Sequence, residues 1–126
     1  MASVKDPSDT SGRLIAAEKV TGTTVYNRAG EKLGSVEDVM LDKFTGKTCY
    51  AVLSFGGFLG IGDRYFPIPW EKLTYDTTMG GFVVDIDKRT LENAPSYQQN
   101  ENVRWDDPVW GERVDQHYGA TRSTLI

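Results

Sequence analysis

A glycine-rich stretch, SFGGFLGIG at residues 54–62, is the part of the sequence whose composition most suggests chemistry. A dinucleotide fingerprint needs glycines at relative positions one, three and six, and no glycine here starts that pattern. Gly57 and Gly62 have P-loop spacing, but Asp63 and Arg64 stand where that motif needs lysine and then serine or threonine. The following DRYFPIPW is β-like, whereas a phosphate loop opens a helix. The stretch is therefore predicted to connect two strands of a hairpin and to bind no nucleotide.

Three large apolar side chains interrupt this stretch, namely Phe58, Leu59 and Ile61. Connecting segments run over the protein surface, where polar residues are usual. Two interpretations stay open for the three residues. They fold back as a plug over one end of the domain, or they form a docking patch of the kind that exposed apolar clusters mark.

Titratable side chains elsewhere form no catalytic motif. Glu37, Asp38 and Asp42 could hold a hard cation or do acid–base work, but no nucleophile or base accompanies them. They are interpreted as solvated carboxylates, with cation binding as the alternative. With one cysteine, Cys49, and one histidine, His117, the chain can form neither an intramolecular disulfide nor a Cys/His zinc site. We predict no catalytic residue, no cofactor and no metal ligand.

Length and charge indicate one acidic domain. The chain has 126 residues, enough for one compact domain with tails, and a net charge of -4 at pH 7. Binding to nucleic acid relies on clustered Lys and Arg, so no nucleic-acid partner is predicted. No segment approaches the roughly 20 apolar residues of a membrane-spanning helix. Since the N-terminus also lacks the apolar core of a secretory signal, we expect a cytoplasmic protein without membrane insertion.

The elements that must position these residues are mostly short strands. A first hairpin turns at NRAG, residues 27–30, and the strand after it has apolar residues at spacings that no single face can collect. A β-bulge near Gly34 or near residues 37–38 would correct this and return Val39 and Leu41 to the interior.

The segments that follow complete the predicted sheet. KTCYAVLSF, residues 47–55, is apolar on both faces and is predicted to be the central strand. The two prolines of YFPIPW indicate an edge or a strand end. A turn at residues 76–81 leads to the last strand, and KRTLENAP at residues 88–95 is predicted to form one helical turn capped by Thr90.

A polar segment, residues 96–106, precedes a predicted amphipathic helix at residues 107–119. On that helix Trp110, Val114 and Tyr118 recur every four residues and form one apolar stripe. The stripe could pack on its own domain or on a second subunit. A dimer is preferred, because a domain of this size has a limited core and oligomers are commonly two-fold symmetric.

Three motifs taken together resemble those of the PRC-barrel family: GEKLGSVEDVMLD at 30–42, GKTCYAVLSFGGFLGIG at 46–62 and YFPIPW at 65–70. The family includes the cytoplasmic domain of the photosynthetic reaction-centre H subunit and the C-terminal half of the ribosome maturation factor RimM. The resemblance implies an all-β fold, a small curled antiparallel barrel of about six strands. It also implies a binding or assembly module with no established catalytic residues to carry over.

The predicted domain organisation is a disordered leader at 1–13, a barrel at 14–95, a polar linker at 96–106, a tail helix at 107–119 and a disordered end at 120–126.

The predicted function is a non-enzymatic module that binds another protein or itself. Its candidate contact residues are apolar or aromatic, and they are Phe58, Leu59, Ile61, Trp70, Trp110, Val114 and Tyr118. A sensor that binds a small ligand or a metal is the first alternative. An accessory factor in RNA or ribosome processing, or in the assembly of photosynthetic electron transfer, is the second. The sequence does not specify the partner.

Overall fold

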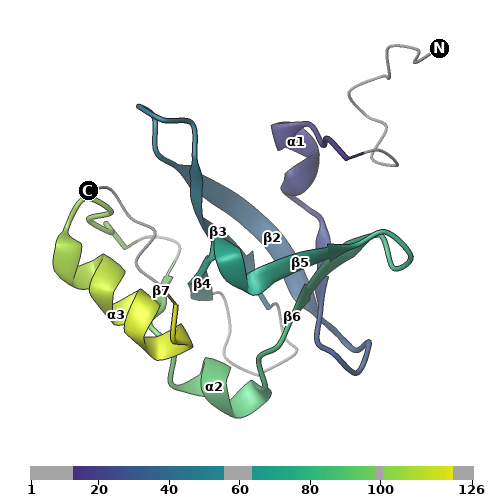
Figure 1. Cartoon of the computed structure of the whole chain (residues 1–126). Helices are drawn as coiled ribbons and strands as arrows, with labels where there is room; N and C mark the ends of the chain where they lie inside the picture. The colour runs from purple at the N-terminus through teal and green to yellow at the C-terminus, as the bar shows by residue number, and fades with distance from the viewer. Residues whose placement is uncertain (1–12, 56–63, 99–100, 121–126) are drawn as a thin grey trace.

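The computed structural model describes residues 13–55, 64–98 and 101–120, and Figure 1 shows their arrangement. The glycine-rich stretch from residue 56 to residue 62 lies outside the described residues. In chain order the elements are α1 (Ala17–Val20), β1 (Thr24–Tyr26), β2 (Lys32–Leu41), β3 (Thr48–Ser54), β4 (Arg64–Pro69), η1 (Trp70–Lys72), β5 (Leu73–Asp76), β6 (Gly81–Val84), α2 (Lys88–Glu92), β7 (Tyr97–Gln98) and α3 (Pro108–Tyr118).

Seven strands form one sheet in the order β5-β6-β1-β2-β3-β4-β7. This confirms the predicted all-β fold class with a C-terminal helix. Three details differ from the expectation. There are seven strands, β1 and β6 pair in parallel, and the sheet ends at β5 and β7, so it is not closed within the described residues. The additional strand, β7, comes from the segment that was expected to be a polar linker.

Two bulges bend β2. The register opposite β1 skips Leu33, and the register opposite β3 skips Glu37, which are the two places that the apolar spacing predicts. As a result Leu33 and Val36 lie in the core, and Val39 packs partly buried against it. The expectation for Leu41 is wrong, because it is 53% exposed. A third register shift lies just before this residue, between Met40 and Leu41.

The predicted burial of β3 on both faces is confirmed. Residues 49–53 are all buried, and β3 pairs with β2 on one side and β4 on the other. Ala51 and Leu53 are completely inaccessible to water. Burying a Leu or Ile side chain stabilises a fold by about 1.5–3 kcal/mol. Side chains from both ends of the chain complete this core, among them Val25, Ile68, Val84 and Leu91.

The prolines of β4 explain how the tail can cover this strand. Pro67 and Pro69 are buried, and β3 pairs with β4 from Tyr65 to Pro69. On its other side β4 pairs with β7 only at Arg64 and Tyr65, and helix α3 packs against β4. A proline leaves no unsatisfied N–H at a strand edge that a helix covers.

Two short helices differ from the expectation. The residues ahead of the first hairpin, RLIAAEKV at 13–20, have a pattern that favours a strand, but helix α1 forms there. Helix α2 is present, but its cap is Asp87 and not Thr90. The Asp87 Oδ1 atom accepts hydrogen bonds from both the backbone N and the Oγ1 of Thr90, each at 2.8 Å. Thr90 therefore lies inside the helix as a donor.

Helix α3 begins and ends at residues typical of those positions. The Oδ1 atom of Asp107 accepts a hydrogen bond from Val109 N at 2.9 Å, and Pro108 occupies the first turn. Gly119 follows the helix with a φ of 63°, a left-handed conformation that favours glycine. In the part of the chain that the structure describes, no helix has both the length and the apolar character needed to cross a membrane.

Candidate binding groove between the hairpin and the tail

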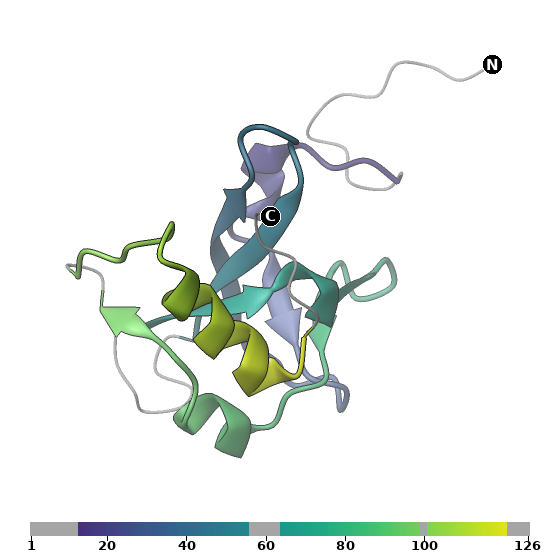
Figure 2. The same ribbon diagram turned by 60° about the vertical axis from the view of Figure 1, so that its left-hand side comes forward.

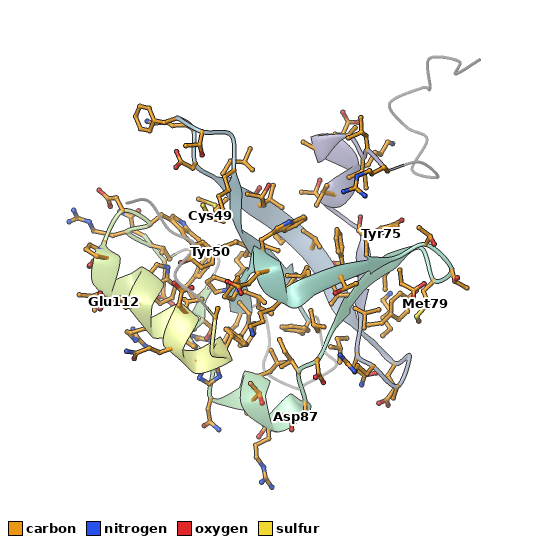
Figure 3. All side chains as sticks on the ribbon, in the orientation of Figure 1. Cys49, Tyr50, Tyr75, Met79, Asp87 and Glu112 are labelled. Atoms are coloured by element: carbon orange, nitrogen blue, oxygen red, sulfur yellow. The ribbon has the colours of Figure 1, made fainter. Side chains whose placement is uncertain are left out.

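A groove lies between the β2–β3 turn and the segment that leads into α3. Residues 40–44 line it on the side of the turn, Cys49 and Tyr50 line it from β3, and residues 105–108 with Gly111 line it on the side of the tail. Its volume is about 470 Å³, and binding clefts typically measure roughly 300–1,000 Å³. Figure 3 shows Cys49 and Tyr50 on the side of β3 that faces α3. This feature is called the groove below.

An aromatic cluster holds the tail against the sheet, and it consists of Tyr50, Tyr65, Tyr97, Trp105 and Trp110. The ring of Trp105 is central, with centroid distances of 6.2 Å to Tyr50, 5.9 Å to Tyr97 and 6.3 Å to Trp110. Tyr97 also meets Tyr65 edge to face at 5.5 Å. Such aromatic pairs contribute about 0.5–1.5 kcal/mol each beyond the burial of their area. The cluster therefore fixes the tail side of the groove.

Helix α3 adds further contacts below the aromatic cluster. Val114 is 1% exposed and packs with Cys49 and Tyr50. Asp115 is 4% exposed, and its Oδ1 atom accepts a hydrogen bond of 3.4 Å from the Tyr50 hydroxyl. Near the end of the helix the Nε2 atom of His117 lies 2.8 Å from the Thr90 carbonyl oxygen. Figure 2 shows the helix lying across the sheet, close to α2.

The turn on the other side of the groove presents apolar side chains to solvent. Phe44 is 85% exposed and Leu41 is 53% exposed. The turn is ordered by its own hydrogen bonds, since Asp42 Oδ1 accepts from Phe44 N at 2.9 Å and Gly46 N donates to the Asp42 carbonyl at 2.7 Å. Gly46 has a φ of 79°, which glycine adopts without strain. These hydrogen bonds order the backbone of the turn that carries Phe44.

The candidate contact residues have different positions. Phe58, Leu59 and Ile61 lie outside the described residues. Trp70 is partly buried against the core, with its ring centroid 5.4 Å from that of Phe82.

The apolar stripe of the tail helix packs on the chain's own sheet. Val114 is buried, and Trp110 and Tyr118 are partly buried against the cluster that contains Cys49 and Tyr50. A contact of these residues with a partner stays a prediction.

None of the predicted contact residues that the structure describes lines the groove, and the lining residues that sequence reasoning missed include Leu41, Phe44, Trp105 and Gly111. Phe44 had a signal, because an aromatic residue in the tight turn DKFTG has few neighbours to bury it. Trp105 stood in a segment interpreted as a polar linker, although a tryptophan rarely stays in solvent. Gly111, in the interior of a helix, lowers helix propensity by about 1 kcal/mol relative to alanine and indicated a packing role.

The carboxylates of the β2 bulge influence the aromatic cluster. Burial first, then the charge of Asp38, the neighbouring Tyr65 and the charge of Glu37 raise the pKa of Tyr97 from 10.0 to about 12. The third carboxylate, Asp42, accepts a hydrogen bond from Phe44 N in its own turn. Among residues 13–55, 64–98 and 101–120, no three His, Cys, Asp or Glu side chains gather to hold a metal ion.

This raised pKa predicts an alkaline loss of stability. The folded protein holds the Tyr97 proton more tightly than the unfolded chain does. Its contribution to stability is therefore complete below about pH 10 and is lost as the pH rises through about 12. An absorbance titration of phenolate formation in wild type, Tyr97→Phe and Asp38→Asn measures this. Tyr97→Phe should remove one phenolate step near pH 12 and leave that of Tyr118, whose pKa burial also raises, and Asp38→Asn should move the Tyr97 step to lower pH.

A control distinguishes this effect from a general change of surface charge. Glu31→Gln removes one exposed carboxylate that is not among the groups acting on Tyr97. It should leave the titration where it is in wild type. An equal shift for Glu31→Gln and Asp38→Asn would contradict the assignment.

A second hollow, of about 530 Å³, lies beside β5 and β6. Its lining includes Arg28, Lys72, Asp76 and Asp85. Arg28 and Asp85 form an ion pair of 3.6 Å, and both side chains are largely in solvent. Solvated charges of both signs are typical of an ordinary protein surface. The groove, with its aromatic and aliphatic lining, is the stronger candidate for a binding site.

The comparison with protein families agrees with the fold. A sequence model of the PRC-barrel domain matches residues 13–91. No curated protein matches the chain. One similar solved structure is described as a 16S ribosomal RNA processing protein, RimM, from Pseudomonas aeruginosa, with 16% sequence identity and a TM-score of 0.43. The similarity covers 68% of this chain and 50% of that one, so this chain spans half the length of that protein.

Proposed function

Because the chain belongs to the PRC-barrel domain family, we propose that it is a non-enzymatic module that binds another protein chain through the groove. One observation carries the proposal. The groove has an apolar lining, and at its rim Phe44 is 85% exposed and Leu41 is 53% exposed. A cytoplasmic location is part of the same proposal.

The physical support comes from the unfavourable hydration of this surface. Single exposed apolar residues are normal, but apolar side chains that gather around a concave surface mark interaction sites. The rim supplies Phe44 and Leu41, and the lining adds Met40, Tyr50 and Trp105. Aromatic residues and Met are enriched at protein interfaces, because each offers a large contact area. A partner that covers the groove would remove this area from water.

The alternative functions have less support. A metal sensor would need Glu37, Asp38 and Asp42 to converge, but Asp42 orders its own turn and the other two lie near Tyr97. A factor that binds RNA would need a basic surface, and the chain has a net charge of -4.

Site-specific photocrosslinking tests the proposal. In cells that produce the full chain, p-benzoylphenylalanine replaces Phe44 in one variant and Leu14 in a control. Leu14 is a suitable control because it is 86% exposed, close to the 85% of Phe44, and does not line the groove. Irradiation should link position 44, and not position 14, to one defined protein that mass spectrometry identifies. Equal products at both positions would overturn the groove as the binding site.

A further inference from the structure

We propose that the partner in the groove is a second copy of this chain, in a two-fold pair in which Phe44 of each copy enters the groove of the other. This inference rests on the proposed function, because it names the occupant of the same groove. Its test below can fail while that function stands.

The arrangement of the patch suits a two-fold contact. In such a contact one surface patch meets its own copy, so the patch must supply both a projection and a recess. Here both are adjacent, because residues 42–44 line the groove and also belong to the turn that presents Phe44 to solvent. The β2–β3 turn extends beyond the rest of the sheet in the two views of Figures 1 and 2. A projecting turn of this kind can reach into a neighbouring molecule.

The lining of the groove suits an aromatic ring. Tyr50 and Trp105 offer aromatic faces and edges, and their ring centroids lie 6.2 Å apart. Pro108 and Gly111 line the groove from the α3 helix, and Gly111 adds no side chain to the lining. The volume of about 470 Å³ admits more than one side chain. Phe44 with Leu41 beside it is an occupant of that kind.

Charges around the groove are complementary between two copies. Lys43 lies on the turn, and its Nζ atom is 5.7 Å from the centroid of the Phe44 ring, so this charge accompanies the ring. Asp106 lies on the tail side of the groove. The other two carboxylates of the lining are engaged, because Asp42 orders the turn and Asp107 caps α3. In the proposed pair Lys43 of each copy faces Asp106 of the other.

Sedimentation velocity of the full chain over a range of concentrations tests the role of Phe44. Wild type and Leu14→Glu should form dimers with the same dissociation constant. Phe44→Glu should raise that constant about 30-fold or more, which is the loss expected for an interface hot spot. Both substitutions are at positions about equally exposed in one copy. Equal thermal unfolding of the two variants at a concentration where both are monomeric will show that Phe44→Glu folds.

A charge reversal experiment tests the geometry. Lys43→Asp and Asp106→Lys should each weaken dimer formation roughly tenfold, because two pairs of like charges then face each other. A mixture of the two variants should dimerise as wild type does, since each mixed pair again joins opposite charges at both contacts. If Lys43 and Asp106 acted only within one copy, the mixture of the two variants would show no such recovery.

Each outcome decides the inference. A dimer that Phe44→Glu weakens and that recovers in the charge mixture supports it. A monomeric wild type, or a Phe44→Glu variant that dimerises as wild type does, overturns it. If wild type is monomeric and position 44 crosslinks to a different protein, the second copy is excluded while the binding function stands. If wild type is monomeric and positions 14 and 44 crosslink alike, both proposals fail.

Discussion

Val114→Asp is expected to lower the free energy of unfolding by about 3 to 5 kcal/mol, the cost typical of an uncompensated buried charge. Val114 is 1% exposed at the contact between α3 and β3, beside Cys49 and Tyr50. A carboxylate there would lie in an apolar environment next to Asp115, which is also buried. The carboxyl group either takes up a proton or forces the helix off the sheet, and in the second case the tail side of the groove leaves with the helix. Urea denaturation together with hydrogen exchange of the α3 amides measures both effects.

The control for this prediction uses the same helix. Gln116→Asp introduces the same charge two residues further on, at an exposed position. It should change the free energy of unfolding by about 0.5 kcal/mol or less, as is usual for surface substitutions, and should leave the exchange of α3 slow. If Val114→Asp and Gln116→Asp were equally stable, the docking of α3 on its own sheet would be wrong.

Gly34→Ala is expected to destabilise the fold by about 3 kcal/mol, at the upper end of the usual range for overpacking. A Cβ atom at this position would overlap the Ser54 carbonyl oxygen and come within 2.8 Å of the Phe55 Cα atom. Both neighbours are backbone atoms of the end of β3, which cannot rotate away as a side chain can. The β2 and β3 strands would have to separate where Gly34 lies against Ser54 and Phe55. Chemical denaturation measures the loss.

Gly46→Ala separates this steric effect from the conformational freedom of glycine. Gly46 has a φ of 79°, but a Cβ atom there meets nothing within 4 Å. The substitution should therefore lose about 1 kcal/mol, from the left-handed backbone alone. Gly34 lacks a positive φ, so its larger loss would come from the overlap. Equal losses at both positions would show that the close approach of β2 and β3 is not as described.

The two variants also separate the two parts of the groove. Val114→Asp acts on the tail side, whereas Gly34→Ala acts on the pairing of the strands that carry the turn. If the groove forms an interface, Val114→Asp should weaken binding at the groove even at a low denaturant concentration, at which the sheet itself is still folded. The binding surface depends on two segments that are far apart in the sequence and meet only after folding.

Local elements of this protein followed from the sequence because their causes lie within a few residues. The turn at residues 42–46 ends at a glycine with positive φ, and the bulges of β2 follow from apolar residues out of phase with the strand. The cap at Asp107 likewise depends on its own first turn. The error at α2 was also local, since Asp87 and Thr90 are both good caps and only the backbone conformation decides between them.

The tertiary structure alone decided the parallel pairing of β1 with β6, the addition of β7 to β4, and the groove. An apolar pattern shows that a side chain favours burial, but it does not show what covers it. The stripe of α3 was visible in the sequence, while its position on β3 and β4 depends on aromatic rings from four separate segments. Phe44 stays exposed because its turn extends past the core. As for the α3 stripe, whether another segment covers the ring depends on distances in space, which the sequence does not contain.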